Sequence, residues 1–136
     1  MGMSSMENEG ENAEHRRLVK ALIQELKNQG FEILNAESDG YEPCSEIESC
    51  FPDVKSYNRK KEFAVFGLAK TCTDLAKEQT EVQIKIFACR FMYKGKSKGA
   101  AVPLCIAITK GCEKQLDDCL SKLKLNRKKN IFKYAF

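Results

Sequence analysis

Asp53 and Lys70 are the residues of this sequence whose types and spacing could do chemistry. Asp53 follows Pro52 at the start of an extended segment, and Lys70 directly follows the apolar run FAVFGLA. A carboxylate can hold a hard cation such as Mg²⁺, which prefers oxygen ligands and keeps several waters. A neighbouring lysine could orient or deprotonate an attacking water and offset phosphate charge. The pair could therefore carry out metal-assisted hydrolysis of a phosphodiester. The alternatives are that Asp53 is a turn or cap residue and that Lys70 marks the return of a strand to solvent.

Position 68 lies two residues before Lys70, and a carboxylate there could bind the same cation as Asp53. Residues two apart on a strand point to the same side, so an acid there would lie beside Lys70. The sequence has Leu68, which cannot bind a cation. The predicted metal ligands are therefore Asp53, the main-chain carbonyl of Ala69 and a carboxylate from elsewhere, for which Glu14 is the expected replacement. The other acids considered for this role are Glu46, Glu62 and Asp74.

Regular elements must position these residues, and the first helix has the clearest pattern. Leu18, Leu22 and Leu26 recur at helical spacing, Asn12 can cap the start and Gly30 supplies a stop. After it, hydrophobic patterning predicts strands near 31–37, from 52 and over 62–71, a polar connection over 73–78, a helix over 80–93, a strand over 100–109 and a helix over 113–123. Residues 131–136 form either an edge strand or a packed tail.

The order helix, strand, strand, strand, helix, strand, helix predicts an α/β fold with a mixed sheet. The first three strands are expected to form an antiparallel meander, and strands joined through a helix can lie parallel. Pro103 favours an edge position, or a strand start, for the strand over 100–109. A length of 136 residues suits one core, so residues 12–136 are predicted to be a single domain and 1–11 a flexible tail.

The composition favours a protein of the cytoplasm. The longest apolar stretches are far shorter than the ~20 residues of a membrane span, and the polar N-terminus has no signal-peptide pattern. The seven cysteines are odd in number and lack a CxxC pair, so reduced and mostly buried thiols are expected. Their spacing predicts neither a zinc site nor an iron–sulfur cluster.

Positive charge gathers in the glycine-rich segment KGKSKG and just before it. We expect these side chains to bind nucleic-acid phosphates, although a solvated surface gives the same pattern. Gln83, on the second long helix, could line the catalytic site or be a surface residue. The only histidine, His15, is expected to be exposed. The predicted phosphate-binding residues are Arg90, Lys94, Lys96 and Lys98.

Together these segments resemble the PD-(D/E)XK nucleases of the restriction-endonuclease-like fold. The resemblance covers residues ~12 to 110 and is carried by Pro52-Asp53-Val54, FGLAKT, Asp74-Leu75 and TEVQIKIF. It implies a restriction-endonuclease-like core, a Mg²⁺ cofactor, DNA as the favoured partner, and Asp53, Lys70 and Gln83 as catalytic residues. Leu68 departs from the family pattern. The alternative is an inactive interaction module that keeps the fold, in which an apolar edge or the C-terminal segment could pair two copies as a homodimer.

Overall fold

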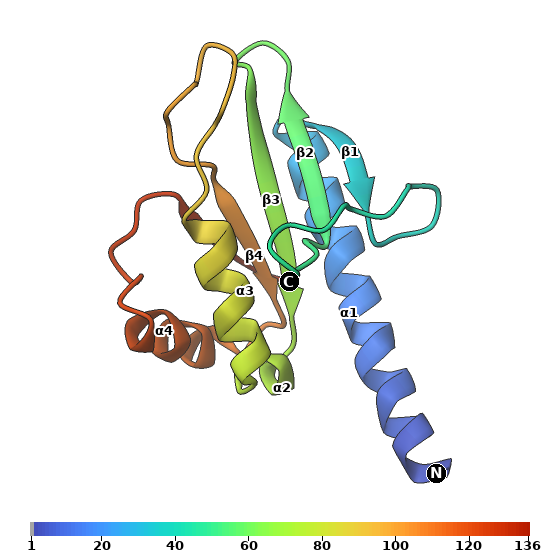
Figure 1. The fold of residues 1–136 in the computed structure, drawn as a ribbon. Helices are drawn as coiled ribbons and strands as arrows, with labels where there is room; N and C mark the ends of the chain where they lie inside the picture. The colour runs from blue at the N-terminus through green and yellow to red at the C-terminus, as the bar shows by residue number, and fades with distance from the viewer. Residues whose placement is uncertain (1) are drawn as a thin grey trace.

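The computed structural model describes the backbone of residues 2–136, with the side chains of residue 10 and residues 12–136. Along the chain a helix is followed by three strands, two helices, a strand, a helix and a last strand (Figure 1). The helices are α1 (Gly2–Asn28), α2 (Cys72–Leu75), α3 (Glu78–Ala88) and α4 (Glu113–Lys122). The strands are β1 (Glu32–Ala36), β2 (Val54–Asn58), β3 (Phe63–Lys70), β4 (Leu104–Ile108) and β5 (Ile131–Ala135).

Within residues 2–136 the strands form one five-stranded mixed sheet in the order β1-β2-β3-β4-β5. The pairs β1–β2 and β2–β3 are antiparallel, whereas β3–β4 and β4–β5 are parallel. The predicted mixed α/β fold and the antiparallel meander are confirmed. The C-terminal segment forms a strand at the edge of the sheet, which was one of its two predicted alternatives.

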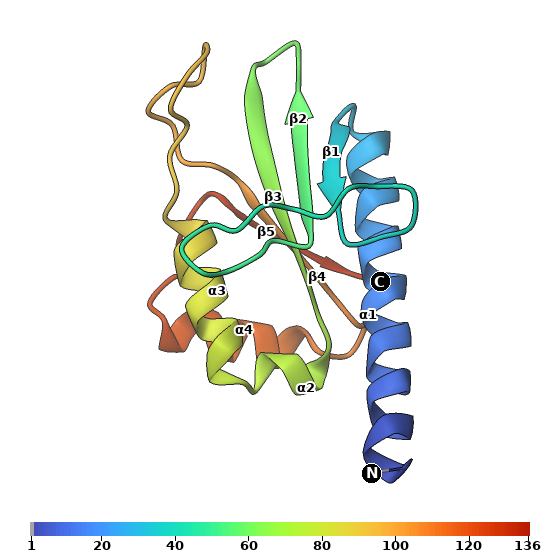
Figure 2. The same cartoon turned by 45° about the vertical axis from the view of Figure 1, so that its right-hand side comes forward.

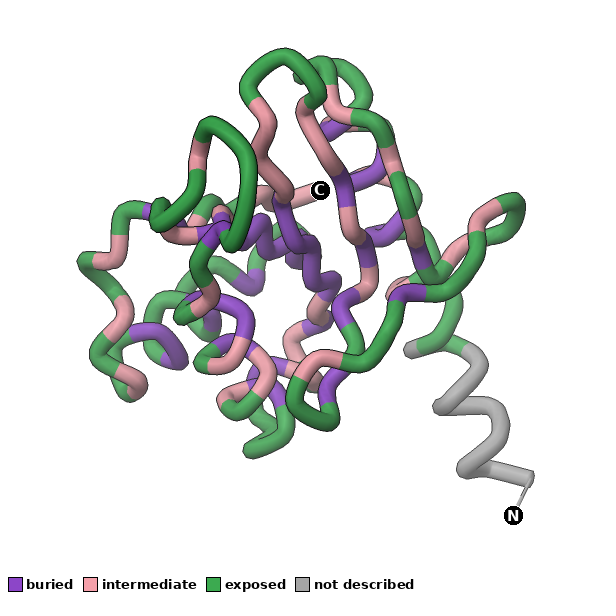
Figure 3. Tube along the Cα trace, turned by 45° about the horizontal axis from the view of Figure 1, so that its top comes forward, coloured by how far each residue is buried: buried purple, intermediate pink, exposed green. Residues whose placement is uncertain are grey.

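Helices cover the sheet on both faces (Figure 2). The leucine stripe of α1 is fully buried against one face, where Val65 and Ala69 of β3 lie in the same apolar cluster. The opposite face of β3–β5 packs against α2, α3 and α4, with Leu68 and Phe87 in that cluster. Buried residues accordingly concentrate along the central strands, and the loops are exposed (Figure 3).

Gly67 lets α1 approach β3 closely. A Cβ atom at this position would lie 2.7 Å from Cδ2 of Leu22 and 3.1 Å from Cβ of Val54. Both distances are shorter than ordinary contacts between carbon atoms. The close packing of α1 on β3 thus depends on the absence of a side chain at residue 67.

Several predicted boundaries were wrong. The first helix begins at Gly2, so Asn12 lies inside it, because the polar segment before Asn12 contains good helix formers such as Glu and Met. The predicted tail is thus helical from Gly2, and residue 1 lies outside the described residues. The helix predicted over 80–93 ends at Ala88, because the chain then turns into an extended segment, residues 89–103, which leads to β4 and which we call the arm.

Of the two positions that Pro103 favours, the structure shows the strand start and not the edge, because β4 begins at Leu104 and lies between β3 and β5. Pro103 precedes the strand, so its missing N–H leaves the ladder intact, and its carbonyl accepts a hydrogen bond from the Phe66 N–H at 3.0 Å. The polar connection over 73–78 contains the short helix α2. Its capping box joins Thr71 and Asp74.

The prediction of reduced thiols was wrong for one pair. Cys72, at the start of α2, forms a disulfide with Cys112, which precedes α4, and their Cα atoms are 5.3 Å apart. The partners are 40 residues apart in sequence, so only the packing of α2 on α4 brings them together. Cys44 and Cys105 are buried free thiols, and burial raises the pKa of each to about 12.

None of the described helices combines the length and the apolar character that crossing a membrane requires.

Candidate functional site

Asp53 lies just before β2, where that strand meets the end of β3. Its N–H donates to the Gly67 carbonyl at 2.9 Å, and its carboxylate oxygen Oδ2 accepts from the Ala69 N–H at 2.8 Å. The backbone of β3 therefore fixes the carboxylate. The Asp53 side chain keeps 13% of its surface exposed, so solvent or a ligand can reach it.

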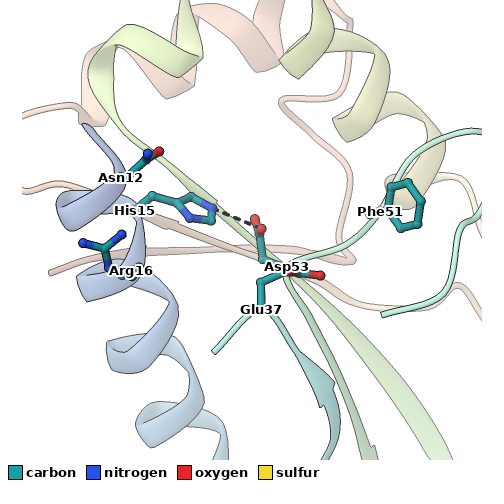
Figure 4. A pocket seen from close by; sticks show the side chains of 6 residues that line it. All are labelled: Asn12, His15, Arg16, Glu37, Phe51 and Asp53. Carbon is teal, nitrogen blue, oxygen red and sulfur yellow. Dashed lines mark hydrogen bonds and ion pairs between the residues drawn. The ribbon is translucent and has the colours of Figure 1, made fainter. Parts of the chain in front are cut away.

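His15, on α1, lies against Asp53. Its Nε2 is 3.1 Å from Oδ1 of Asp53, and its side chain is only 32% exposed (Figure 4). The hydrogen bond to Asp53 raises the pKa of His15, although burial alone would lower it. The prediction that His15 is exposed was therefore wrong, because its side chain is partly buried in contact with Asp53. Residue 15 precedes Leu18 and Leu22 by three and seven residues, a helical spacing that could have indicated this inward-facing side.

Lys70 and Gln83 are brought together by the packing of α3 on β3. Nζ of Lys70 donates a hydrogen bond to Oε1 of Gln83. Burial lowers the pKa of Lys70, and the negative charges of Asp53 and Asp74 act in the opposite direction. The structure thus unites Asp53, Ala69, Lys70 and Gln83, as the sequence predicted, at one end of β3.

Asp74 adds a second carboxylate to this end of the sheet. It accepts from the Thr71 N–H at 3.1 Å, and its own N–H donates to Oγ1 of Thr71 at 3.2 Å. Burial alone would raise the pKa of Asp74, but the bonds from Thr71 and the charge of Lys70 lower it overall. Its charge also acts on His15. We call Asp53, His15, Lys70, Gln83 and Asp74 the Asp53 cluster.

An open pocket of about 490 Å³ adjoins the cluster at His15 and Asp53. His15 and Asp53 form one part of its wall, and Arg16 contributes a positive charge from the same helix (Figure 4). Arg16 and His15 are the basic side chains of the pocket, and Glu37 and Asp53 are its acidic ones. Its lining residues are Asn12, His15, Arg16, Glu37, Phe51 and Asp53.

The Glu14 carboxylate, the expected second metal ligand, is bound by other side chains. It accepts from Arg17 at 2.7 Å and from Oγ1 of Thr109, and these bonds lower the pKa of Glu14 to about 2. In the part of the chain that the structure describes, no group of three or more His, Cys, Asp or Glu side chains is placed to hold a metal ion. Asp53 would therefore share Mg²⁺ with waters and a substrate phosphate, the mode of binding for which one or two carboxylates suffice.

Leu68 shows why the strand lacks a second carboxylate. Its side chain is fully buried in the apolar cluster between the sheet and α2–α4. A carboxylate in that environment would lose its hydration and be destabilised unless it were paired or coordinated. Position 68 serves the core in this chain.

The predicted phosphate-binding residues lie away from the Asp53 cluster. Lys94, Lys96 and Lys98 lie in the arm beside the β2–β3 turn, at the opposite end of β3 from Lys70. Arg90 forms an ion pair with Glu48 at 3.2 Å. Eight residues of β3 separate the two regions by ~23 Å, from ~3.3 Å per residue. The arm and the cluster are therefore separate surfaces.

No protein-family model, curated protein or solved structure matches this chain. Its function must be inferred from the geometry of the Asp53 cluster and of the surfaces around it.

Proposed function

We propose that this chain is a divergent, metal-dependent phosphodiesterase of nuclease-like fold that acts on nucleic acid, with DNA as the favoured substrate. The observation that carries this proposal is the convergence of Asp53, Lys70 and Gln83, from three separate elements, at one end of β3. A carboxylate, a buried amine and an adjoining open pocket are the parts that phosphodiester hydrolysis requires.

The topology supports the proposal. An N-terminal helix, an antiparallel meander and a helix-linked parallel strand are the elements expected of a restriction-endonuclease-like core. In this arrangement the residue before β2 and the last residue of β3 meet at the same end of the sheet. That end is where the family resemblance expects the catalytic residues.

Each member of the site has a chemical role in this proposal. Mg²⁺ held by Asp53 and a substrate phosphate would supply Lewis-acid activation of the phosphorus centre. Lys70, whose pKa is lowered by burial, orients the attacking water and can take its proton, while Gln83 holds the amine in place. Arg16 offsets the charge of the phosphate in the pocket. His15 orients the Asp53 carboxylate as a positioning residue.

A second candidate is an inactive module that binds nucleic acid or a protein partner. Leu68 favours it, because a fully buried leucine replaces the strand carboxylate. In addition, among the described side chains no group of three or more His, Cys, Asp or Glu residues that could hold a metal ion includes Asp53. This candidate predicts binding that does not depend on Asp53 or Lys70.

A cleavage assay separates the two candidates. Labelled single- and double-stranded DNA and RNA are incubated with Mg²⁺, Mn²⁺ or a chelator, using the wild type, Asp53→Asn and Lys70→Met. The phosphodiesterase should cleave only with metal, and each substitution should reduce the rate about 10²- to 10⁴-fold without a similar loss of binding. Matched controls are Asp118→Asn and Lys114→Met, which change an exposed ion pair on α4 and should leave cleavage unchanged.

Absence of metal-dependent cleavage by the wild type, with binding intact in both variants, would support the inactive module. Cleavage that persists in chelator, or that survives Asp53→Asn, would contradict the proposed role of Asp53.

A further inference from the structure

A second surface lies on the sheet face opposite α1. Figure 1 shows α3 and α4 in front of one side of the sheet, and no described helix lies over β1 and β2 on that face. The arm after α3 stands beside the exposed end of β3. Between the arm and the strands is a groove of about 320 Å³. We call it the arm groove, and it is lined by Leu34, Lys55, Tyr57, Glu62, Ala64, Met92, Tyr93 and Lys94.

The arm is held against the sheet by its own hydrogen bonds. Oγ of Ser97 donates to the Lys61 carbonyl at 3.2 Å, and Nζ of Lys96 donates to the Lys60 carbonyl at 3.5 Å. Within the arm, the Gly99 N–H donates to the Met92 carbonyl at 2.9 Å. These bonds fix the position of the arm over the β2–β3 turn, so the groove is part of the folded structure.

Two tyrosines give the arm groove aromatic surface. Tyr93 is 78% exposed, and Tyr57 is half-buried on β2 opposite Ala64 of β3. Leu34, 41% exposed, lies across the groove on β1, and the nearly buried Met92 lies beside Tyr93. Exposed aromatic and apolar side chains gathered in a concave site are typical of a surface that binds a partner.

The charge around these rings is positive. Lys55 and Lys94 line the groove, and Nζ of Lys94 is 5.5 Å from the centre of the Tyr93 ring. Among its described lining residues Glu62 is the one acid, and Lys96 lies 3.6 Å from it as an ion-pair partner. The tyrosine rings can stack on flat rings of a ligand, and Lys55 and Lys94 can pair with negative charges spaced along it.

We infer that the arm groove binds single-stranded nucleic acid, with unpaired bases stacked on Tyr57 and Tyr93 and phosphates held by Lys55 and Lys94. Aromatic platforms between basic side chains are the general means of binding such strands. A duplex hides its base faces, an acidic peptide leaves the tyrosine rings unused, and a second copy of this chain would bury unpaired lysines.

This inference rests on the proposed function, because it names the form of nucleic acid delivered to the Asp53 site. Tyr57 on β2 is four residues beyond Asp53, which lies just before that strand, and the separation along extended chain is ~13 Å. One short strand could therefore reach both the arm groove and the Asp53 cluster.

Fluorescence anisotropy in chelator tests the groove without cleavage. The probes are labelled single-stranded DNA and RNA of about 12 nucleotides, the matching duplex and an acidic peptide. Single strands should bind more tightly than the duplex or the peptide. Tyr93→Ala should weaken this binding about 5- to 150-fold, while Tyr93→Phe should retain it because the ring remains. Phe132→Ala, which removes a 46% exposed ring on β5, is the matched control and should bind as the wild type does.

Lys94→Ala should also weaken binding and lower the salt dependence by about 0.7, the slope lost with one single-strand phosphate contact. Tighter binding of the duplex or the peptide, or unchanged binding by Tyr93→Ala, would overturn the inference. Tyr93-dependent binding without any metal-dependent cleavage would support the groove and reject the phosphodiesterase. If cleavage requires metal but Tyr93→Ala changes neither the affinity for single strands nor the cleavage rate, the phosphodiesterase would be supported and the groove rejected.

Discussion

Replacing Gly67 by alanine should disturb both the stability and the Asp53 cluster. The new Cβ would lie 2.7 Å from Cδ2 of Leu22 and 3.1 Å from Cβ of Val54. Ordinary contacts between carbon atoms are ~3.5–4.0 Å, so either Leu22 changes its rotamer or α1 moves away from β3 by roughly 1 Å. Leu22 is fully buried, which leaves little room for a new rotamer.

Overpacking of this kind usually costs ~1–3 kcal/mol of unfolding free energy. For a chain of this size, each kcal/mol corresponds to roughly 3–4 °C in Tm. Urea denaturation measures the loss directly. Gly10→Ala is the matched control, because no atom lies within 4 Å of the Cβ it would add to α1. That change should leave the stability unchanged or raise it by ~0.5–1 kcal/mol, since alanine favours helix.

A double-mutant cycle tests the proposed clash. Leu22→Ala alone should cost ~2–5 kcal/mol, because it leaves a cavity in the core. Adding Gly67→Ala to Leu22→Ala should then cost little, because the clashing methyl group is gone. An equal loss from Gly67→Ala in both backgrounds would refute the steric argument.

The same substitution should affect His15. If α1 moves outward, the distance between His15 and Asp53 grows and the bond that raises the pKa of His15 weakens. NMR titration should then give a lower pKa for His15 in Gly67→Ala than in the wild type. An unchanged pKa would show that β3 accommodates the methyl group without moving α1.

Three further changes have defined outcomes. Below pH ~6.5 the unfolding free energy of the wild type should exceed that of His15→Gln by ~1 kcal/mol or less. This difference should vanish as the pH rises through the raised folded-state pKa of His15, and urea titrations at several pH values measure it. At neutral pH the unfolding free energy of Lys70→Met should be at least as large as that of the wild type. As the pH rises from the lowered folded-state pKa of Lys70 toward ~10.5, the unfolding free energy of the wild type should increase relative to that of the variant, which the same titrations record. Breaking the Cys72–Cys112 disulfide should cost ~4 kcal/mol, from the entropy of its loop, and Cys72→Ala should make the urea midpoint insensitive to reductant.

The elements that could be predicted from sequence are those with strong local patterns. Leucines at four-residue spacing identify α1, and the continuous apolar run before Lys70 identifies β3, because each pattern reports which faces are buried. The convergence of Asp53 and Lys70 also follows from the pattern, since an antiparallel pair brings the start of β2 to the end of β3. Gln83 joins them because α3 follows β3 after a short connection.

Other features depend on distances that no local pattern contains. The disulfide requires α2 and α4 to pack together across 40 residues of sequence. The position of Lys94 at the far end of β3 depends on how long the arm is and where it folds back. His15 contacts Asp53 only because Gly67 brings α1 close to β3. The central position of β4 depends on β5, whose short sequence also suited a packed tail.

The irregular register of β1 affects how this chain behaves at high concentration. Between Ile33 and Asn35 the pairing with β2 shifts by one residue, so Leu34 is an extra residue on the outer strand. A bulge twists a strand and interrupts its row of free N–H and C=O groups, which makes the edge a poor template for another chain. The bulge thus presents Leu34 to a ligand and also protects the open side of the sheet against cross-β aggregation.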